Sequence, residues 1–243
     1  MPRALFEKAG NARYISHLDL MRVFQRAFKR AGLPLTHTQG FNPRPSVSIA
    51  LPLSLGVESR CELLDFELEH PCACDEICGR LNAALIDGVH IREVYEKGDK
   101  LKNLSLLQSR LILEYDQMVP DGATAKIENL FSQPELIVEK KGKNGTTEQD
   151  IIPMLRRLTV KKLSNREVEL SVLHSCQNPS LNPMQLSAAI TRYLPDLAAD
   201  YVRCFREEIY DVFSDRFAAE AADDLRLRRC VHVVGIFYLR KSR

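Results

Sequence analysis

Arg-Tyr-Ile-Ser-His-Leu-Asp-Leu-Met-Arg, from Arg13 to Arg22, opens the stretch around which this 243-residue chain is organised. Ser16 followed three residues later by Asp19 is a capping-box pattern, which predicts a helix over 17–31 with Ser16 as its N-cap. Gly32 predicts the end of that helix. Apolar side chains recur between these points at the spacing of one helical face. They are Leu20, Val23, Phe24, Ala27, Phe28 and Ala31.

The opposite face of this helix carries four cations: Arg22, Arg26, Lys29 and Arg30. Charge runs usually form solvated surfaces, and the last two cations also suit the negative end of a helix dipole. The other interpretation is an anion-binding face. Arginines four residues apart line one stripe of a helix, and their planar guanidinium groups suit bidentate contacts with phosphate. Both interpretations place these side chains on the surface.

A stretch rich in turn-forming residues follows, Gln-Gly-Phe-Asn-Pro-Arg-Pro from Gln39 to Pro45, and it predicts a stiff loop. Binding residues concentrate on such loops, and Phe41 beside Arg44 suits stacking on a base. The alternative is that Phe41 fills the core. Together with the helix cations, Gln39, Phe41, Asn42 and Arg44 form the predicted binding set.

His17 is the one candidate for catalysis in this stretch, and a lone histidine is weak evidence. Ser16, His17 and Asp19 resemble a hydrolase set, but they lie within one helical turn. A nucleophile, a base and its orienting group normally converge from separate elements. The sequence also contains no phosphate-binding loop, dinucleotide fingerprint or zinc-protease motif.

Hydrophobic patterns predict an α+β fold. In the first half they give the order β-α-β-β-α-β, the ferredoxin-like pattern. The predicted elements are strand 3–9, helix 17–31, strand 46–51, strand 61–69, helix 75–85 and strand 90–96. Within the fourth element, Leu64 and Phe66 alternate with Asp65 and Glu67, which predicts one buried face and one acidic face that is exposed or covered by a partner. Because an acidic sheet repels phosphate, the helix and the loop are the better candidates for nucleic-acid binding.

A polar segment near 97–105 predicts a linker to a second α+β domain of similar pattern. The expected organisation is two ferredoxin-like domains in tandem, 1–98 and 105–213, and a tail over 214–243. In the second domain we expect strands 109–115, 135–140, 157–163, 167–173 and 201–212, helices 123–131 and 183–193, and a polar hairpin-like loop over 141–149. The tail combines a predicted helix over 216–227 with a continuous apolar segment over 231–239.

Four motifs in this order and spacing resemble a bacterial family of radical-SAM-linked proteins. They are Phe6 to Gly10, Arg13 to Arg22, Gln39 to Pro45 and Leu-Pro-Leu-Ser-Leu-Gly-Val-Glu-Ser from Leu51 to Ser59. The similarity is densest over 4–70. The resemblance implies a partner, a radical SAM enzyme with a cobalamin-binding-type domain, and a genomic setting near ribonuclease and ribosomal-protein genes. It implies no mechanism.

Composition limits the other possibilities. Thirty-four basic and 32 acidic residues give a net charge of +2, so any phosphate binding depends on local clustering. Without a signal pattern or a run of roughly 20 apolar residues, a cytoplasmic location away from membranes is expected. Seven cysteines then predict free thiols. Cys72, Cys74 and Cys78 match neither a radical SAM cluster motif nor a four-ligand zinc site. The iron–sulfur cluster and SAM are therefore expected on the partner, and no metal or cofactor on this chain.

These observations lead to a non-catalytic accessory protein of a radical SAM enzyme that binds RNA or presents a substrate to that enzyme. The expected further partner is RNA or a ribosome-related particle. The competing hypotheses are a metal-free RNA endonuclease that uses His17 and a stand-alone RNA-binding module on the same scaffold.

Overall fold

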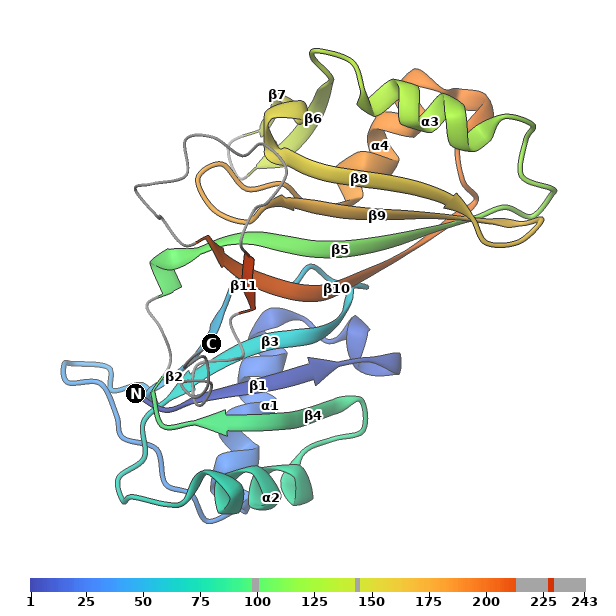
Figure 1. Ribbon diagram of the computed structural model, residues 1–243. Coiled ribbons are helices and arrows are strands. Elements are labelled where there is room, and N and C mark those ends of the chain that lie inside the picture. Colours follow the sequence, from blue (N-terminus) through green and yellow to red (C-terminus); the bar gives the residue numbers. More distant parts are fainter. Residues whose placement is uncertain (98–100, 143–144, 213–226, 230–243) are drawn as a thin grey trace, which may run out of the picture.

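The computed structural model describes residues 1–97, 101–142, 145–212 and 227–229 (Figure 1). The described part is a mixed α/β fold with four α-helices and a mainly sheet core. Nine strands form one sheet, and two more form a separate hairpin. In Figure 1, α1 lies behind the strands of the first half and α2 lies at one end of the molecule, whereas α3 and α4 lie at the other end.

The first half follows the predicted order of elements. They are β1 (Arg3–Lys8), α1 (His17–Arg30), β2 (Val47–Ala50), β3 (Glu58–Phe66), α2 (Cys74–Ala84) and β4 (Val89–Tyr95). The strands pair antiparallel in the spatial order β4-β1-β3-β2, with Ala4 of β1 opposite both Leu64 and Val94. A short 3-10 helix, Gly10–Tyr14, leads into α1.

The second half repeats this spatial order with different strands, β10-β5-β9-β8. Its elements are β5 (Leu104–Glu114), α3 (Ala123–Phe131), β6 (Ile137–Gly142), β7 (Gly145–Asp150), β8 (Leu155–Lys162), β9 (Glu167–Ser175), α4 (Met184–Tyr193) and β10 (Tyr201–Val212). Strand β5 begins five residues earlier than the prediction of 109, because Leu104, Leu106 and Leu107 are buried and extend its apolar pattern. The predicted polar loop over 141–149 is part of the β6–β7 hairpin.

A short parallel pairing between β3 and β10 joins the two halves, and we call it the seam. Phe205 lies opposite Glu58, and Arg206 lies opposite Ser59. The seam occupies only the start of β3, because β2 pairs with the end of the same edge. The halves therefore share one continuous sheet, whereas the sequence predicted two domains in tandem. Because β3 and β10 lie far apart in the chain, no local sequence pattern predicts that they pair.

Three groups of buried side chains form the core. One packs α1 and α2 against the first half of the sheet and includes Phe24, Phe28 and Phe66. A second, larger group packs α3 and α4 against the second half. The third lies between the halves and contains Cys61 and Leu63 of β3. The alternation predicted for this strand is confirmed at its end, where Leu64 and Phe66 are buried, Asp65 is half-buried in an ion pair with Arg3, and Glu67 is exposed just beyond the strand. Nearer the start of β3, the face that was predicted to be exposed or covered by a partner carries Cys61 and Leu63, which the second half covers.

The predicted tail lies almost entirely outside the described residues. Leu227, the expected last residue of the tail helix, is instead the first residue of β11 (Leu227–Arg229), which pairs antiparallel with β10. The apolar segment predicted over 231–239 falls outside the described part of the chain.

Candidate nucleic-acid interface

Helix α1 is confirmed, with its predicted cap. The Ser16 side chain accepts a hydrogen bond from the backbone N–H of Asp19 at 3.2 Å, and its hydroxyl donates to the Asp19 carboxylate at 2.7 Å. These bonds and the charge of Asp19 stabilise the helix N-terminus. The Ser16 bond, followed by the Arg22 guanidinium, lowers the pKa of Asp19. Ser16 and Asp19 are thus accounted for by the helix itself.

The four predicted cations on α1 are all exposed, but their environments differ. Arg22 forms an ion pair with Asp19 at 2.7 Å, one turn before it. Arg30 donates through Nη2 to the backbone carbonyl of Ala84 at 2.5 Å, so it also satisfies the C-terminal end of α2. Within the described residues, Arg26 and Lys29 have no side-chain hydrogen bond or ion pair. We call Arg22, Arg26 and Lys29, which lie within one stripe of the helix, the cationic face.

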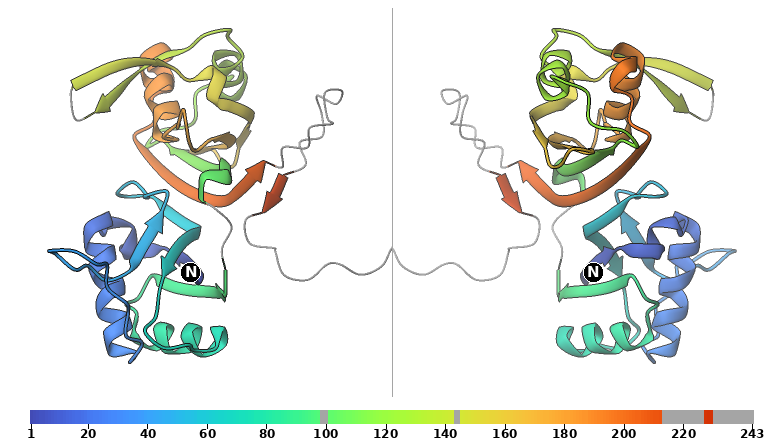
Figure 2. Two further views of the ribbon diagram at one scale, coloured as in Figure 1. Left: turned by 90° about the vertical axis from the view of Figure 1, so that its left-hand side faces the viewer. Right: turned by 90° about the vertical axis from the view of Figure 1, so that its right-hand side faces the viewer.

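The predicted loop is a narrow projection, which we call the arm (36–46). Backbone hydrogen bonds join its two sides, from Thr38 N–H to the Arg44 carbonyl and from Ser46 N–H to the Thr36 carbonyl, each 2.8 Å. The Thr38 hydroxyl also accepts from the Arg44 backbone N–H at 3.0 Å. These contacts give the arm a defined shape without a core of its own, and it protrudes from the first half in both figures (Figures 1 and 2).

Phe41 at the tip of the arm has a relative exposure of 107%, the largest among the exposed large hydrophobic residues. The alternative that Phe41 fills the core is therefore wrong, because the ladder of backbone bonds carries the tip away from the body. Gln39, Asn42 and the Arg44 side chain are exposed around it. An aromatic ring held in water without a protein partner is available to stack on a ligand.

A groove connects the base of the arm with the helix. Its volume is about 430 Å³, and its walls include Gln25, Phe28 and Lys29 of α1 and His37 and Pro45 of the arm. Lys29 therefore lies on the side of α1 that faces the arm. The groove also contains Glu69, and Glu67 is exposed near the arm base, where it accepts from the Thr36 hydroxyl at 3.1 Å. The region is thus not uniformly positive.

His17 is the first residue of α1 and is partly buried. It forms no side-chain hydrogen bond within the described residues, so no second proton-transfer group is positioned by it. The described chain contains no group of three or more histidine, cysteine, aspartate or glutamate side chains placed to hold a metal ion. Cys72, Cys74 and Cys78 are free thiols packed beside the first core.

A polar network close to the seam was not predicted from the sequence. Arg206 of β10 donates through Nη1 to Glu62 of β3 at 2.7 Å; the Glu62 side chain is buried, with an exposure of 1%, and the Arg206 side chain is mostly buried, with an exposure of 11%. Arg13 pairs with Glu58 at 2.8 Å and donates to the Tyr14 hydroxyl at 2.9 Å. The charged partners lie far apart in the chain, so the spacing of residues in the sequence does not predict these ion pairs. The motif from Leu51 to Ser59, which contains Glu58, was the one sequence feature that pointed to this part of the fold.

Comparisons with known proteins identify a family for this chain but give no function. A family model described as "Uncharacterized protein conserved in bacteria" (DUF2344) matches residues 2–183. No curated protein sequence matches the chain. Among the described residues, no helix combines the length and the apolar character needed to cross a membrane.

Solved structures give distant likenesses only. A Cbf5–Nop10–Gar1 complex aligns with a TM-score of 0.46 and 9% identity over 86% of this chain and 48% of that one. The archaeal box H/ACA sRNP Nop10–Cbf5 complex gives 0.42 and 9%, over 84% and 46%. A putative glycine cleavage system transcriptional repressor gives 0.22 and 13%, over 84% and 96%. The chain spans about half the length of the first two, and at these scores none of the likenesses bears on its function.

Proposed function

The chain belongs to the DUF2344 family of proteins conserved in bacteria, and from that premise we propose that it is a non-catalytic RNA-binding protein that presents RNA, or a substrate carried on RNA, to a radical SAM enzyme. The observation that carries the RNA-binding part is Phe41, which is fully exposed at the tip of a hydrogen-bonded arm. The cationic face of α1 lies on the same half of the molecule. Together they offer stacking and phosphate contacts.

Phe41 supplies the stacking contact in this proposal. Stacking of a base on an aromatic side chain contributes about 1–3 kcal/mol and tolerates any base. The Phe41 ring is already exposed, and backbone hydrogen bonds already order the arm. Little conformational entropy is therefore lost on binding. An unpaired base in a loop or a single strand is the expected partner, because bases within a duplex are stacked on one another.

Arg22, Arg26 and Lys29 supply phosphate contacts, and Arg44 extends them along the arm. Arg26 and Lys29 have no competing protein partner in the described chain, whereas Arg22 must exchange Asp19 for phosphate. Because the Arg22–Asp19 pair is more than half exposed on both sides, that exchange costs little. Glu67 and Glu69 near the arm base oppose phosphate, so we expect the RNA backbone to follow α1 and not the edge of the sheet.

The wider setting of the proposal rests on sequence resemblance. The motifs of the first half resemble radical-SAM-linked proteins, so we propose a radical SAM partner that carries the iron–sulfur cluster and SAM, and a cytoplasmic location for the complex. We also propose that each half, 1–98 and 105–213, is a ferredoxin-like unit. The repeated strand orders β4-β1-β3-β2 and β10-β5-β9-β8 support this division. Co-purification of the tagged protein from its native host tests the partner separately from the RNA.

RNA binding is tested by fluorescence anisotropy with a labelled single-stranded RNA and a labelled hairpin, in EDTA. Phe41→Ala should weaken binding about 5- to 150-fold and Phe41→Trp should preserve it. The double change Arg22→Gln and Arg26→Gln should reduce the salt dependence of log K by about 1.4 for single-stranded RNA, since two phosphate contacts are lost.

The matched control is Lys140→Gln, an exposed lysine on β6 of the second half. It should leave both affinity and salt dependence unchanged. Binding that survives both the Phe41 and the arginine changes but falls in the Lys140 variant would place the interface on the second half and contradict the proposal. Cleavage of the RNA in EDTA that disappears in His17→Ala would instead support the endonuclease hypothesis.

A further inference from the structure

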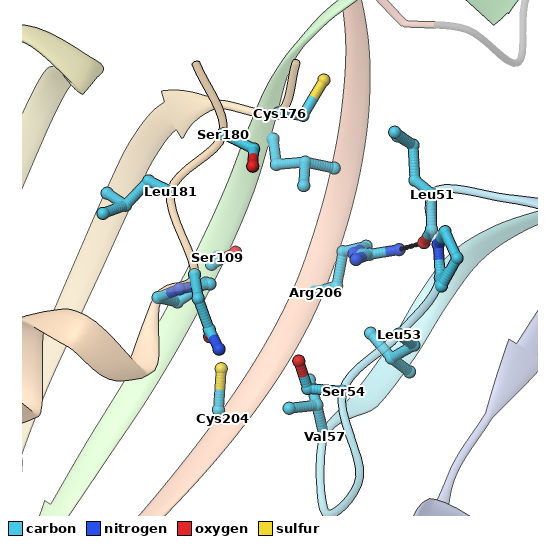
Figure 3. A pocket seen from close by; sticks show the side chains of 14 residues that line it. Leu51, Leu53, Ser54, Val57, Ser109, Cys176, Ser180, Leu181, Cys204 and Arg206 are labelled. Atoms are coloured by element: carbon cyan, nitrogen blue, oxygen red, sulfur yellow. Dashed lines mark hydrogen bonds between the residues drawn. The ribbon is translucent and has the colours of Figure 1, made fainter. Parts of the chain in front are cut away.

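A cavity of about 250 Å³ lies beside the seam (Figure 3), and it shares no lining residue with the groove between α1 and the arm. Four segments form its walls: the loop from Leu51 to Val57 between β2 and β3, the strand β5, the strand β10, and the stretch from Cys176 to Pro183 that leads into α4. The cavity therefore exists only because the seam brings the two halves together. Its volume lies just below the usual 300–1,000 Å³ of ligand pockets, so only a small molecule fits.

Arg206 provides the charged group of this cavity. Its Nη1 donates both to the Glu62 carboxylate and to the backbone carbonyl of Leu51, each at 2.7 Å. Within the described residues, Nε and Nη2 donate to no protein atom, and neither is among the fully buried unpaired atoms. Figure 3 shows the Arg206 side chain lying along the cavity, with one bond to Leu51. Two donor nitrogens thus remain for a ligand, in the fork that matches a carboxylate.

Arg206 is the charged group that an anion would meet in this cavity. Lys8 is buried on β1 and donates to the carbonyls of Arg13 and Ile15. Burial lowers its pKa, and the charge of Glu62 acts in the opposite direction. Lys8 does not line the cavity, so Arg206 is the member of this group through which an anion would bind.

Ser109 of β5 pairs directly with Arg206 of β10 and contributes a hydrogen-bond acceptor to the cavity. His174, which is fully buried, lies 3.1 Å through Nδ1 from the Ser175 carbonyl and 2.9 Å through Nε2 from the Ser109 hydroxyl. A carbonyl only accepts, so Nδ1 donates; burial lowers the pKa of His174 to about 4, which leaves Nε2 unprotonated at neutral pH. The Ser109 hydroxyl therefore donates to Nε2 and keeps its lone pairs for the cavity.

The remaining lining of the cavity is mixed. Leu51, Leu53, Val57, Leu107 and Leu181 contribute aliphatic side chains, Cys176 and Cys204 contribute thiols, and Ser54, Ser180 and Asn182 contribute polar groups. Burial raises the pKa of these thiols to about 11 and about 12, so both are neutral. A ligand that fits this surface has an apolar body and one anionic end.

We propose that the cavity at the seam binds a small aliphatic carboxylate of the size of a branched-chain amino or hydroxy acid. Arg206 holds the carboxylate through Nε and Nη2, Ser109 accepts a hydrogen bond from a hydroxyl or amino group next to it, and the leucine and valine side chains enclose the aliphatic part. This site is independent of the proposed RNA interface and requires a different ligand.

The test is isothermal titration calorimetry on the full chain with three probes: 4-methylpentanoate, its uncharged amide, and 2-hydroxy-4-methylpentanoate. The carboxylate should bind about tenfold or more tightly than the amide, because it gains a charge-assisted bond to Arg206. The hydroxy acid should bind more tightly still, and Ser109→Ala should remove that additional gain while leaving 4-methylpentanoate unaffected.

Two variants separate binding from folding. Arg206→Met alone leaves Glu62 buried without a partner, so it is combined with Glu62→Leu, and this double variant should lose the preference for carboxylate over amide. Cys204→Leu leaves the ion pair intact and fills the cavity from β10, so it should abolish binding of all three probes. Arg26→Gln, on the outside of α1, should bind them normally. Equal affinity for acid and amide, unchanged binding by Cys204→Leu, or no binding at about 10 mM probe would each overturn the proposal.

Discussion

Arg26 and Arg206 are the same type of side chain in opposite settings. Arg26 lies on the outside of α1 with no partner among the described residues, and water stabilises its charge. Arg206 is mostly buried and depends on Glu62 and the Leu51 carbonyl for much of that stabilisation. An arginine at the surface can be changed with little effect on folding, whereas a buried one is part of the fold. The comparison predicts a graded series of effects.

The largest effect is expected for Arg206→Ala. The change leaves the Glu62 carboxylate buried and without its partner, which costs about 3–5 kcal/mol in the free energy of unfolding. Urea denaturation followed by circular dichroism measures it. Arg206→Met with Glu62→Leu should recover most of the loss, because no buried charge remains. A single variant as stable as the wild type would show that the pair does not support the seam.

The next effect concerns His174 and pH. Burial lowers its pKa from 6.5 to about 4, so the unfolded chain binds more protons than the folded one between these values. Stability should therefore be fully present above pH 6.5 and fall as the pH decreases, by about 2 kcal/mol at pH 5. Urea denaturation at pH 7.5 and 5 tests this against His174→Gln. The variant should lack that part of the pH dependence; identical slopes would exclude His174 as its source.

A smaller effect is expected at the helix cap. Ser16→Ala removes the acceptor for the Asp19 N–H and should cost about 1 kcal/mol of stability, while Ser16→Asn should keep most of it. Thermal unfolding of the three proteins gives the comparison. If alanine and asparagine destabilise equally, the cap contributes less than the geometry implies.

The smallest effect is expected for Arg26→Gln, within about 0.5 kcal/mol of the wild-type stability. Its guanidinium is exposed and its neighbours on the cationic face are also cations, so its removal takes away no partner. Thermal unfolding of Arg26→Gln, measured together with the Arg206 variants and the wild type, tests this expectation. A loss comparable to that of Ser16→Ala would indicate an unrecognised contact of Arg26 within the fold.

The sequence was informative where structure depends on neighbours in the chain. The cap at Ser16, the stripe of cations on α1 and the order of strands all follow from local spacing, and the structure confirms these elements. The exposure of Phe41 did not follow, because a ring in a loop is equally compatible with the core. The arm's backbone bonds, which no side-chain pattern records, decide between these outcomes.

The polar groups at the seam were beyond prediction for a different reason. Arg206 and Glu62 are 144 residues apart, and Ser109 and His174 are 65 residues apart. Arg206, Ser109 and His174 have polar neighbours in their strands, and Glu62 lies beside apolar residues, so alternation alone does not show which of these side chains are buried. The pairing of β3 with β10 and of β5 with β9 determines their burial. The predicted roles of Arg22, Arg26, Lys29, Arg44 and Phe41 stay predictions until RNA binding is measured.

The seam also constrains the order in which the protein can fold. Its two strands close a loop through almost the whole second half of the chain, and contacts between such distant residues form late, because the entropy of loop closure must be overcome first. Until β10 arrives, the start of β3 and one edge of β5 both present unpaired backbone groups, which invite pairing with other chains. Strand β10 pairs with both of these edges, so its arrival joins the two halves into one sheet and removes these two sites of mispairing.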